Sequence, residues 1–510
     1  MLQQKIFQIR NKRAQSEPLP TGSAPYTNSN FYKLRQHGLK PKARCWEHRF
    51  SINSHSQKSS PLKSASRSSG GSVRTITLGT ARPAQECYPW ESLSMRCPNI
   101  ESAKVDGAVE ANATISCDRG EEAYDLSTAM NYGYSAGSPQ LLRYVTEHVE
   151  LVHNPPYDNW ESCLSCGTTS AIEIAFRIFC NPGDTILVED YTYSGTITAA
   201  KAQELNLLGI KMDENGLLPD DLDEKLNAWD VSKGRKPFVL YTIPCGQNPT
   251  SATQTTERRK AVYEVAVKND LYIIEDDPYY FLQLDISGGK ASSAENYFKH
   301  LPSSYLSLDS SGRVLRMDTL SKILAPGLRC GWVTGSAQVI EKFIAYSEVG
   351  VLSPSGPSQV MAYKLLDETW GHEGFLCWLN VLSFQYRRRL DSLLEACNRF
   401  LPRYACTWEA PTIGMFVWVH LHDSSIAQEL LSLNESRRRA IYLDTEERIY
   451  SRARSNGVLV SKGSWFIPDT ERISGVYFRL TFAAAAEPDL TEAVQRFGNA
   501  LELELKNVTG

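Results

Sequence analysis

A lysine and an arginine lie seven residues apart in the segment Thr319–Gly331, and hydroxyl side chains flank the lysine. The apolar run Val314–Met317 comes just before it, so we expect a strand that delivers Lys322 to the edge of a sheet. Serine and threonine hydroxyls could bind a phosphate group together with Arg329. A lysine buried beside a phosphorylated aldehyde is suited to imine formation, because desolvation and nearby cations lower its pKa. The pattern by itself is common, and a solvated loop lysine accounts for it equally well.

Two other expected strands are also followed by residues that could do chemistry, and catalytic residues of open α/β sheets lie beyond the carboxyl ends of strands. Thr168 and Thr169 follow the strand 162–166 and open a helix, whose N-terminus could bind an anion or simply be capped. Tyr193 follows the strand 185–188. It could stack on a flat cofactor ring or pack as an ordinary tyrosine.

Three polar residues stand at positions where an isolated side chain would be unusual. Asn248 lies between two prolines that fix a rigid turn, although a plain Asn-Pro turn is the alternative. Asp276 ends an apolar strand, where a carboxylate is costly to bury without a partner, and a solvated loop acid is the alternative. Arg479 lies inside an apolar strand near the C-terminus. It needs an anion there, which could be a substrate carboxylate or an internal salt bridge.

Composition excludes several classes of protein. The chain has 510 residues, of which 42% are hydrophobic, and a formal net charge of −4. This length predicts about two to four domains, and the near-neutral charge argues against a nucleic-acid binder. No run of about 18 apolar residues occurs, so we expect no membrane span. The 12 cysteines are scattered, which favours a reducing compartment. The C-x-x-C at 163–166 lacks a second ligand pair, so no metal site is expected.

Residues 1–68 differ from the rest of the chain. They contain 13 lysines and arginines but only two acids, Glu17 and Glu47. Such a segment buries too little apolar area to offset chain entropy, so it is expected to be a disordered basic extension. A basic, acid-poor, serine-containing start also resembles an organelle transit segment. We expect a cytoplasmic protein with an unstructured extension. A mitochondrial location is the alternative if residues 1–68 are a transit segment. A third possibility is that the first methionine is wrongly assigned.

From about residue 72 onward, expected strands and helices alternate. The strands are expected at 76–79, 162–166, 185–188, 238–242, 271–274, 314–317 and 331–334, and the helices at 138–145, 170–179, 195–204 and 257–268. This order predicts an α/β fold with a mostly parallel sheet covered by helices on both faces. After a mainly helical stretch to about residue 400, strands at 416–419, 457–460 and 476–480 predict a second, smaller α/β unit. Residues 387–389 are expected to form a solvated helix face and 435–448 a loop insertion.

Two motifs identify a family resemblance. They are Glu-Asp-Asp-Pro-Tyr-Tyr-Phe-Leu-Gln at 275–283 and Leu-Ser-Lys-Ile-Leu-Ala-Pro-Gly-Leu-Arg-Cys-Gly-Trp at 320–332. With the residues above in the same order, the chain resembles class I/II aminotransferases of fold type I, which use pyridoxal 5′-phosphate (PLP). It is most similar to the fungal-type aromatic-amino-acid and kynurenine/2-aminoadipate subgroup. The resemblance implies a small domain formed by the two ends of the chain, 72–125 and 386–507, and a large PLP-binding domain at 126–385.

The resemblance also implies roles for the candidate residues. Lys322 would hold PLP covalently and shuttle the substrate proton, and Asp276 would keep the pyridine nitrogen protonated. Tyr279 and Asn248 would hydrogen-bond the phenolate oxygen of the cofactor, and Tyr193 would stack on its ring. The phosphate would be held by Thr168, Thr169, Thr319, Ser321 and Arg329.

Substrate binding and assembly are implied in the same way. Arg479, with Asn248 beside it, would bind the substrate α-carboxylate. Tyr132 matches a tyrosine that reaches the phosphate of the partner subunit, so a homodimer with shared active sites is implied. Three positions depart from the family pattern. The segment 248–251 ends in serine where glycine is usual, the substrate-side turn reads Gly-Thr-Ala-Arg-Pro at 79–83, and two threonines occupy 168–169.

The implied reaction is ping-pong transamination from an L-amino acid to a 2-oxo acid such as 2-oxoglutarate, with no nucleic acid or membrane involved. An aromatic donor (Trp, Phe or Tyr) is expected, with 2-aminoadipate or kynurenine as the alternative. A PLP lyase or decarboxylase on the same fold is a second alternative. A transcription regulator with an aminotransferase-like body is a third, but residues 1–68 lack the helical apolar periodicity of a winged helix.

Overall fold

The computed structural model describes residues 2–20, 22–34, 39–58, 81–100, 112–284, 293–426 and 430–506. The expected strand 76–79 and the first two residues of the 79–83 turn lie outside the described residues. The chain divides into two compact units. The first unit comprises Met1–Pro182, Asp270–Pro278 and Ala291–Val381, and the second comprises Gly183–Asn269, Tyr279–Lys290 and Leu382–Gly510. The domain boundaries inferred from the sequence remain predictions.

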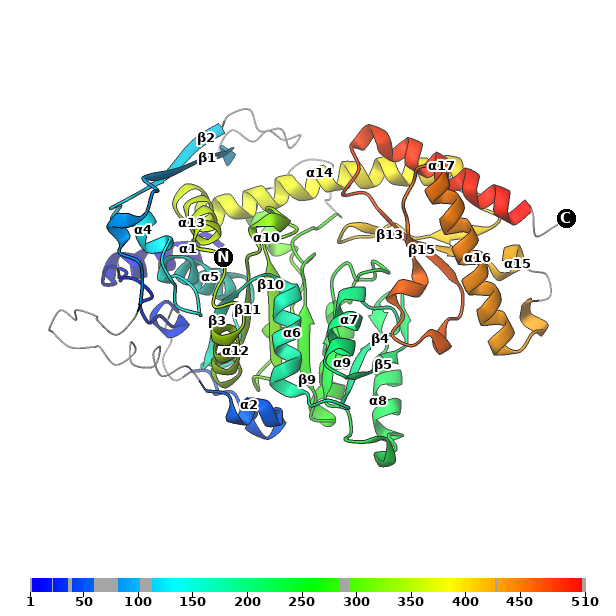
Figure 1. Ribbon diagram of the computed structural model, residues 1–510, viewed down its shortest axis with the longest axis horizontal. Helices are drawn as coiled ribbons and strands as arrows, with labels where there is room; N and C mark the ends of the chain where they lie inside the picture. The colour runs from blue at the N-terminus through cyan, green and yellow to red at the C-terminus, as the bar shows by residue number, and fades with distance from the viewer. Residues whose placement is uncertain are drawn as a thin grey trace. The chain divides into compact units, whose positions relative to one another are not determined.

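The largest sheet has seven strands, and most of them run parallel (Figure 1). Their order is β3 (Trp160–Ser165), β11 (Gly331–Ser336), β10 (Val314–Thr319), β9 (Tyr272–Asp276), β8 (Val239–Thr242), β4 (Thr185–Glu189) and β5 (Asn206–Ile210). β10 pairs in parallel with β9, and β4 pairs in parallel with β5 and β8. β11 is antiparallel to both of its neighbours. The strands are near-continuous apolar runs because helices cover both faces, which confirms the predicted α/β class.

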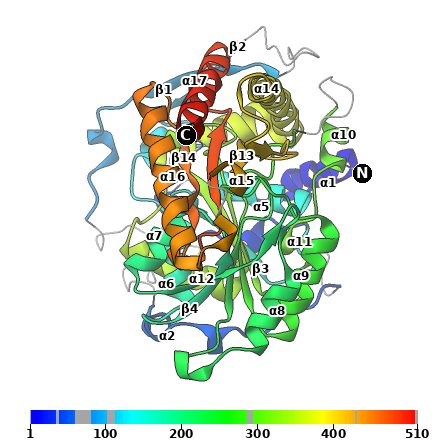
Figure 2. The ribbon, with the colours of Figure 1, turned by 90° about the vertical axis from the view of Figure 1, so that its right-hand side faces the viewer.

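Helices flank the strands of the first unit on two sides. Figure 2 shows α6 (Thr168–Phe179) and α12 (Ala337–Val349) on one side, and α5 (Pro139–Val152) and α11 (Tyr305–Leu308) on the other. α5 begins as the sequence predicts, because the Ser138 hydroxyl accepts a hydrogen bond from the Leu141 N–H and a proline occupies the first turn. The mainly helical stretch includes α13 (Gly356–Tyr363), a π-helix (Lys364–Trp370) and the long α14 (Gly371–Phe400).

The second unit adds a four-stranded antiparallel sheet to β8, β4 and β5. Its order is β12 (Cys406–Trp408), β13 (Phe416–Leu421), β15 (Val476–Thr481) and β14 (Ser461–Lys462). The helices of this unit include α7 (Ser194–Ala202), α8 (Pro219–Asn227), α9 (Thr256–Lys268), α16 (Glu435–Ser455) and α17 (Glu487–Lys506). Apolar residues of β13, β15, α16 and α17 share one buried core. This core fixes β15, which carries Arg479.

Two predictions for the C-terminal region are wrong, and a third, the solvated helix face at 387–389, holds for Arg387 and Arg388 but not fully for Arg389. Residues 435–448 form the first part of helix α16, because Tyr442, Ile449 and Ala453 recur at helical spacing and are buried. The strand expected at 457–460 is replaced by the two-residue β14 directly after it. Arg389 is only partly solvated, since its guanidinium donates to the carbonyl oxygens of Phe482 and Ala483.

The prediction of a disordered N-terminal extension is wrong for the described part of 1–68. Residues 2–15 form helix α1, in which Leu2, Ile6 and Ile9 are buried. These three residues share one helical face, which the low average hydrophobicity of the segment conceals. Farther along the helix, Arg13 Nε donates to Glu147 Oε1 of α5 at 2.9 Å. The pKa of Glu147 falls to about 2: burial acts to raise it, but the hydrogen bonds from Arg13 and His372 outweigh that effect.

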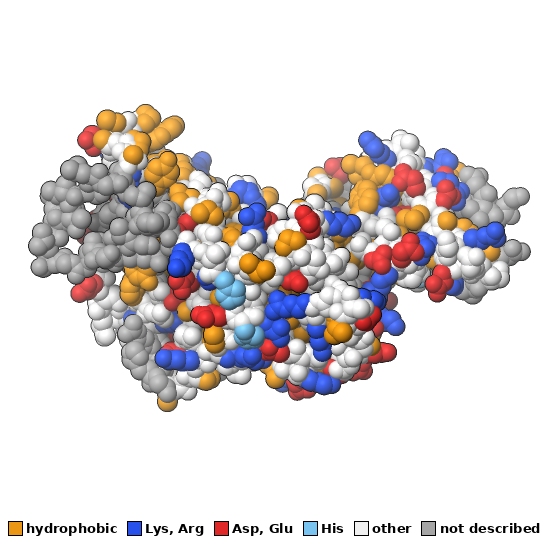
Figure 3. Space-filling view, turned by 60° about the horizontal axis from the view of Figure 1, so that its bottom comes forward, with side chains coloured by type: hydrophobic (Ala, Val, Ile, Leu, Met, Phe, Trp, Pro, Cys, Tyr) orange, Lys and Arg blue, Asp and Glu red, His pale blue; other side chains and the backbone are white. Residues whose placement is uncertain are grey.

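The surface formed by the described residues carries charges of both signs (Figure 3). Figure 3 shows basic and acidic side chains interspersed on the face of the described residues that it presents. Among the helices that the structure describes, none has the length and apolar character needed to cross a membrane. Within the same residues, no group of three or more His, Cys, Asp or Glu side chains is arranged to hold a metal ion.

Candidate active site

The carboxyl end of β10 carries a cluster of hydroxyl groups. Thr319 is the last residue of the strand, and its Oγ1 donates to Ser321 Oγ at 2.9 Å. The Ser321 backbone N–H donates back to Thr319 Oγ1 at 3.2 Å. These bonds fold the chain into a tight turn directly before Lys322. The Arg329 Nη1 group lies 3.4 Å from Ser321 Oγ and donates to the Pro326 carbonyl oxygen at 2.9 Å.

The N-terminus of α6 faces the same arginine. Gly167 precedes the helix with a φ of 87°, and a Cβ atom there would come within 2.5 Å of Arg329 Nη2. Arg329 Nη2 also donates to the Cys166 carbonyl oxygen at 2.9 Å. Glycine is therefore required at 167 for both backbone conformation and space. Thr168 and Thr169 form the first turn of the helix, where backbone N–H groups are free to bind an anion.

Together these groups form a donor set that suits a phosphate dianion. Two hydroxyls, a guanidinium and a helix N-terminus converge within the first unit, and Arg329 is exposed, with no acid paired to it in the part of the chain that the structure describes. Phosphate prefers this combination, because a guanidinium supplies charge and hydroxyl and backbone donors supply direction. The first unit thus brings together the predicted residues Thr168, Thr169, Thr319, Ser321 and Arg329.

Lys322 and Asp276 lie at the ends of neighbouring parallel strands. Asp276 ends β9, is 2% exposed, and pairs in register with Met317 of β10. Lys322 is half-buried in the turn that follows β10. The next residue is anchored, since Trp378 Nε1 donates to the Ile323 carbonyl oxygen at 2.8 Å. The sheet therefore presents an amine and a buried carboxyl group at the same edge as the phosphate-type donor set.

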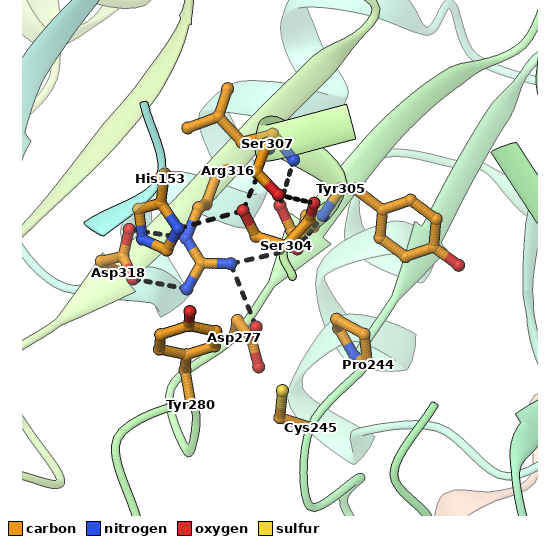
Figure 4. Close-up of polar contacts among 12 residues, drawn as sticks. His153, Pro244, Cys245, Asp277, Tyr280, Ser304, Tyr305, Ser307, Arg316 and Asp318 are labelled. Carbon is orange, nitrogen blue, oxygen red and sulfur yellow. Dashed lines mark hydrogen bonds and ion pairs between the residues drawn. The ribbon is translucent and has the colours of Figure 1, made fainter. Parts of the chain in front are cut away.

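A buried ion cluster holds the ends of β9 and β10 together, as Figure 4 shows for part of it. Arg316 makes a bidentate pair with Asp318, with distances of 3.0 and 2.9 Å. Its Nη1 atom lies 3.0 Å from both Asp277 and Glu275. Burial raises the pKa of Asp318, and Arg316 acts against that shift. Because Glu275 and Asp277 precede and follow Asp276 in the chain, this cluster fixes the backbone that carries Asp276.

The second unit contains a different arginine site. Arg479 of β15 donates from Nη1 to Asn248 Oδ1 at 2.6 Å and from Nη2 to Ser461 Oγ at 3.1 Å. Its guanidinium carbon lies 4.4 Å from the ring centre of Phe416 and 4.8 Å from that of Phe466. The Nε atom is buried without a hydrogen-bond partner among the described residues. Burial lowers the pKa of Arg479, and Tyr279 and Tyr193 act against that shift.

Asn248 is held by a network built on Glu189, the buried last residue of β4. Glu189 Oε1 accepts from Thr242 Oγ1 at 2.6 Å, and Oε2 accepts from Gln247 Nε2 at 3.1 Å. The peptide bond between Asn248 and the following proline is cis. Ser251, which stands where the family usually has glycine, adopts a φ of 64° and donates from Oγ to the Phe416 carbonyl oxygen at 2.7 Å. The serine thus keeps the left-handed turn and stabilises it with a hydrogen bond.

The predicted tyrosines occupy three different settings. Tyr279 is buried and makes an edge-to-face contact with Phe416, with ring centres 5.4 Å apart. Tyr193 precedes α7 and its ring folds over Gly195, which leaves no room for a side chain there. Tyr132 belongs to the first unit and is 59% exposed.

Comparison with known proteins decides the family. The family model for aminotransferase class I and II matches residues 100–497. The chain belongs to the class I and II aminotransferases. It is 49% identical over 490 residues to aminotransferase swnA of Arthroderma benhamiae, covering 93% of this chain and 95% of that protein.

Two further relatives of this aminotransferase support the same conclusion. It is 36% identical over 472 residues to the aromatic amino acid aminotransferase C56E4.03 of Schizosaccharomyces pombe, covering 90% of this chain and 98% of that protein. The crystal structure of aminotransferase Aro8 from Candida albicans superposes with a TM-score of 0.82 at 34% identity, covering 92% of this chain and all of that one. The expected family, fold type and enzyme class are confirmed.

Sequence reasoning missed several residues that shape the aminotransferase site. Phe416, Phe466 and Ser461 surround Arg479, but nothing in their local sequence indicates a contact with an arginine. Glu189 could have been found, because it is a carboxylate ending an apolar strand, the signal that identified Asp276.

Proposed function

We propose that this aminotransferase uses PLP to transfer the amino group of an aromatic L-amino acid to a 2-oxo acid such as 2-oxoglutarate. The observation that carries the cofactor assignment is the phosphate-type donor set of Thr319, Ser321, Arg329 and the α6 N-terminus directly beside Lys322. The names of relatives support the substrates. Besides the Schizosaccharomyces pombe enzyme, an L-tyrosine:2-oxoglutarate aminotransferase of Tapinella panuoides is 36% identical over 391 residues, covering 74% of each chain.

Each assigned residue has a defined task. When bound, PLP supplies an aldehyde that condenses with amines and a protonated ring that accepts electron density. Lys322 would hold the cofactor through its amine and, once released, would move the proton at the substrate Cα. Asp276, which is buried, would hold the proton on the pyridine nitrogen. Tyr279 and Asn248 would donate hydrogen bonds to the phenolate oxygen of the cofactor, and Tyr193 would lie over its ring.

Arg479 binds the α-carboxylate of the amino acid and of the 2-oxo acid in turn. Its partners among the described residues are neutral oxygens and two phenyl rings, so a carboxylate would complete its coordination. The apolar rings also exclude water, which strengthens the ion pair. Because both half-reactions use substrates with the same α-carboxylate, one arginine serves both.

The central test is spectroscopic and chemical together. Purified protein should bind PLP with a visible absorption band, and Lys322→Ala should lose both that band and transamination. A panel of amino acids with 2-oxoglutarate should give glutamate fastest with aromatic donors. Protein that stays colourless after incubation with PLP, or an unchanged band in Lys322→Ala, would refute the assignment.

The same panel separates the alternatives. A lyase or decarboxylase would consume amino acid without forming glutamate. Preference for kynurenine or 2-aminoadipate would instead align the enzyme with the bovine kynurenine/alpha-aminoadipate aminotransferase, which is 33% identical over 442 residues, covering 84% of this chain and 92% of that protein. A regulator would bind DNA at low salt, and we expect no such binding.

We further propose a cytoplasmic homodimer. The exposure of Tyr132 supports a partner contact, and the packing of α1 on α5 supports a protein that retains its N-terminus. Mixed dimers of Lys322→Ala and Tyr132→Phe subunits should regain activity that neither parent dimer has, because one site per dimer would be intact. A monomer observed by light scattering would contradict the homodimer. Finding that α1 has been removed in protein isolated from its own cells would contradict the cytoplasmic location.

A further inference from the structure

A pocket of about 510 Å³ lies in the first unit between the N-terminal segment, α5 and the start of β3. This volume is within the range of about 300–1,000 Å³ typical of small-molecule sites. Among the described residues, its lining contains two carboxyl groups, those of Glu150 and Asp158, against four lysines: Lys5, Lys33, Lys40 and Lys42. The pocket is therefore basic in a chain whose net charge is −4.

Lys33 lies deepest, with 6% of its surface exposed. Its Nζ donates to Asn30 Oδ1 at 2.7 Å and to the Asp158 carbonyl oxygen at 2.9 Å. The same ammonium lies 4.4 Å from the ring centre of Trp160. Its close partners are thus two neutral oxygens and an aromatic face. A buried cation held only in this way gains far less than one paired with an anion.

Two neighbouring lysines are held in the same manner. Lys5 Nζ donates to the Leu151 carbonyl oxygen at 3.0 Å. Lys40 Nζ donates to Asn154 Oδ1 and to the Pro155 carbonyl oxygen, both at 2.8 Å. Among the described residues, no carboxylate lies within 4.0 Å of any of the four ammonium groups that line the pocket. Each ammonium has three donors, so donors remain for a ligand.

Burial disfavours the charged form of the lysine side chains in this pocket. Burial lowers the pKa of Lys33 to about 8 and also lowers the pKa of Lys5 and of Lys40. The carboxylates nearby oppose this only in part; for Lys33 they are those of Glu161, Asp158 and Glu150. A bound anion would relieve the cost of burying these charges.

We propose that this pocket binds a small dianion, either a dicarboxylate or the phosphate group of a metabolite. The lysines would neutralise the charge of the ligand. The site is separate from the phosphate-type donor set, because Trp160 begins the six-residue β3 and Gly167 lies beyond its other end, about 20 Å away. The proposal is independent of the proposed cofactor and substrates.

The test is calorimetric titration of the full-length, PLP-saturated enzyme with inorganic phosphate and, separately, with malonate. Lys33→Met should weaken binding about tenfold or more, and Lys42→Glu, at an exposed position, should weaken it severalfold without disturbing the fold. Lys233→Met, which changes an exposed lysine of the second unit, is the matched control and should bind normally. A response to phosphate alone or to malonate alone identifies which anion the pocket prefers.

Three results would overturn the proposal. The first is no binding of either anion at millimolar concentration. The second is binding by the Lys33→Met and Lys42→Glu variants that equals binding by the unaltered enzyme. The third is binding that is lost in Arg479→Leu but kept in Lys33→Met. The last pattern would place the anion at the substrate arginine. If Lys33→Met does not fold, Lys42→Glu decides alone.

Discussion

Arg316 and Arg479 are both arginines within apolar strands, but their surroundings differ in one respect. Arg316, in the first unit, is fully buried and contacts three carboxylates, those of Glu275, Asp277 and Asp318. Arg479, in the second unit, contacts an amide oxygen, a hydroxyl and two phenyl rings. The positive charge of Arg316 is more than balanced by its three carboxylates, so it needs no further anion. Arg479 has no carboxylate partner among the described residues. A partly buried cation without an acidic partner is therefore the better indicator of a ligand site.

The largest expected effect tests the structural half of this comparison. Arg316→Met should lower the free energy of unfolding by about 3–5 kcal/mol, because three buried carboxylates lose their shared cation. Part of the loss should be recovered on lowering the pH, since burial already raises the pKa of Asp318 and a protonated carboxyl group is cheaper to bury. Denaturant unfolding at two pH values measures both effects.

Arg387→Met is the matched control, since it removes an exposed pair with Asp391. It should change stability by less than about 0.5 kcal/mol. A similar loss for both variants would show that Arg316 has no special structural role.

The next effect tests the ligand-binding half. Arg479→Lys should lower kcat/KM by about a hundredfold, because a lysine cannot reproduce the bidentate pair with a carboxylate. Affinity for PLP should not change. An aromatic amine that lacks a carboxylate should react equally with both enzymes. If that amine also lost reactivity in the variant, the arginine would be acting on something other than the carboxylate.

A smaller effect is expected at the exposed arginine of the phosphate-type donor set. Arg329→Lys should weaken PLP binding about tenfold, since the hydroxyls of Thr319 and Ser321 and the α6 N-terminus remain. Excess PLP should restore turnover, as measured by titrating activity against cofactor concentration. An unchanged PLP dissociation constant would remove Arg329 from the phosphate site.

The smallest effect concerns the rings around Arg479. Phe466→Leu should raise KM for amino acids about threefold to fivefold with little change in kcat, because it removes one cation–π contact worth about 0.5–1 kcal/mol. Trp465→Leu is the control, since the adjacent Trp465 packs on Tyr450 instead. Equal effects of the two substitutions would mean that the ring face of Phe466 does not orient the guanidinium.

The candidate site was partly predictable because its residues follow strands. Lys322 and Asn248 follow apolar strands within a short turn, Asp276 ends one, and parallel strands present their carboxyl ends at one edge. The alternation of strands and helices could also be predicted, because each element has its own local apolar pattern. Helix α16 was missed because its few buried residues are diluted by charge, and α1 was missed because a segment-wide average conceals three residues on one face.

The sequence by itself determined the α/β class, the family and the order of the reactive side chains, since these depend on local periodicity and on motifs. Only the tertiary structure decided which arginine is already neutralised, which turn tolerates serine at 251, and where four lysines from separate segments meet in one pocket. These facts depend on groups far apart in the chain, and the energy of a charge is set by its neighbours in space.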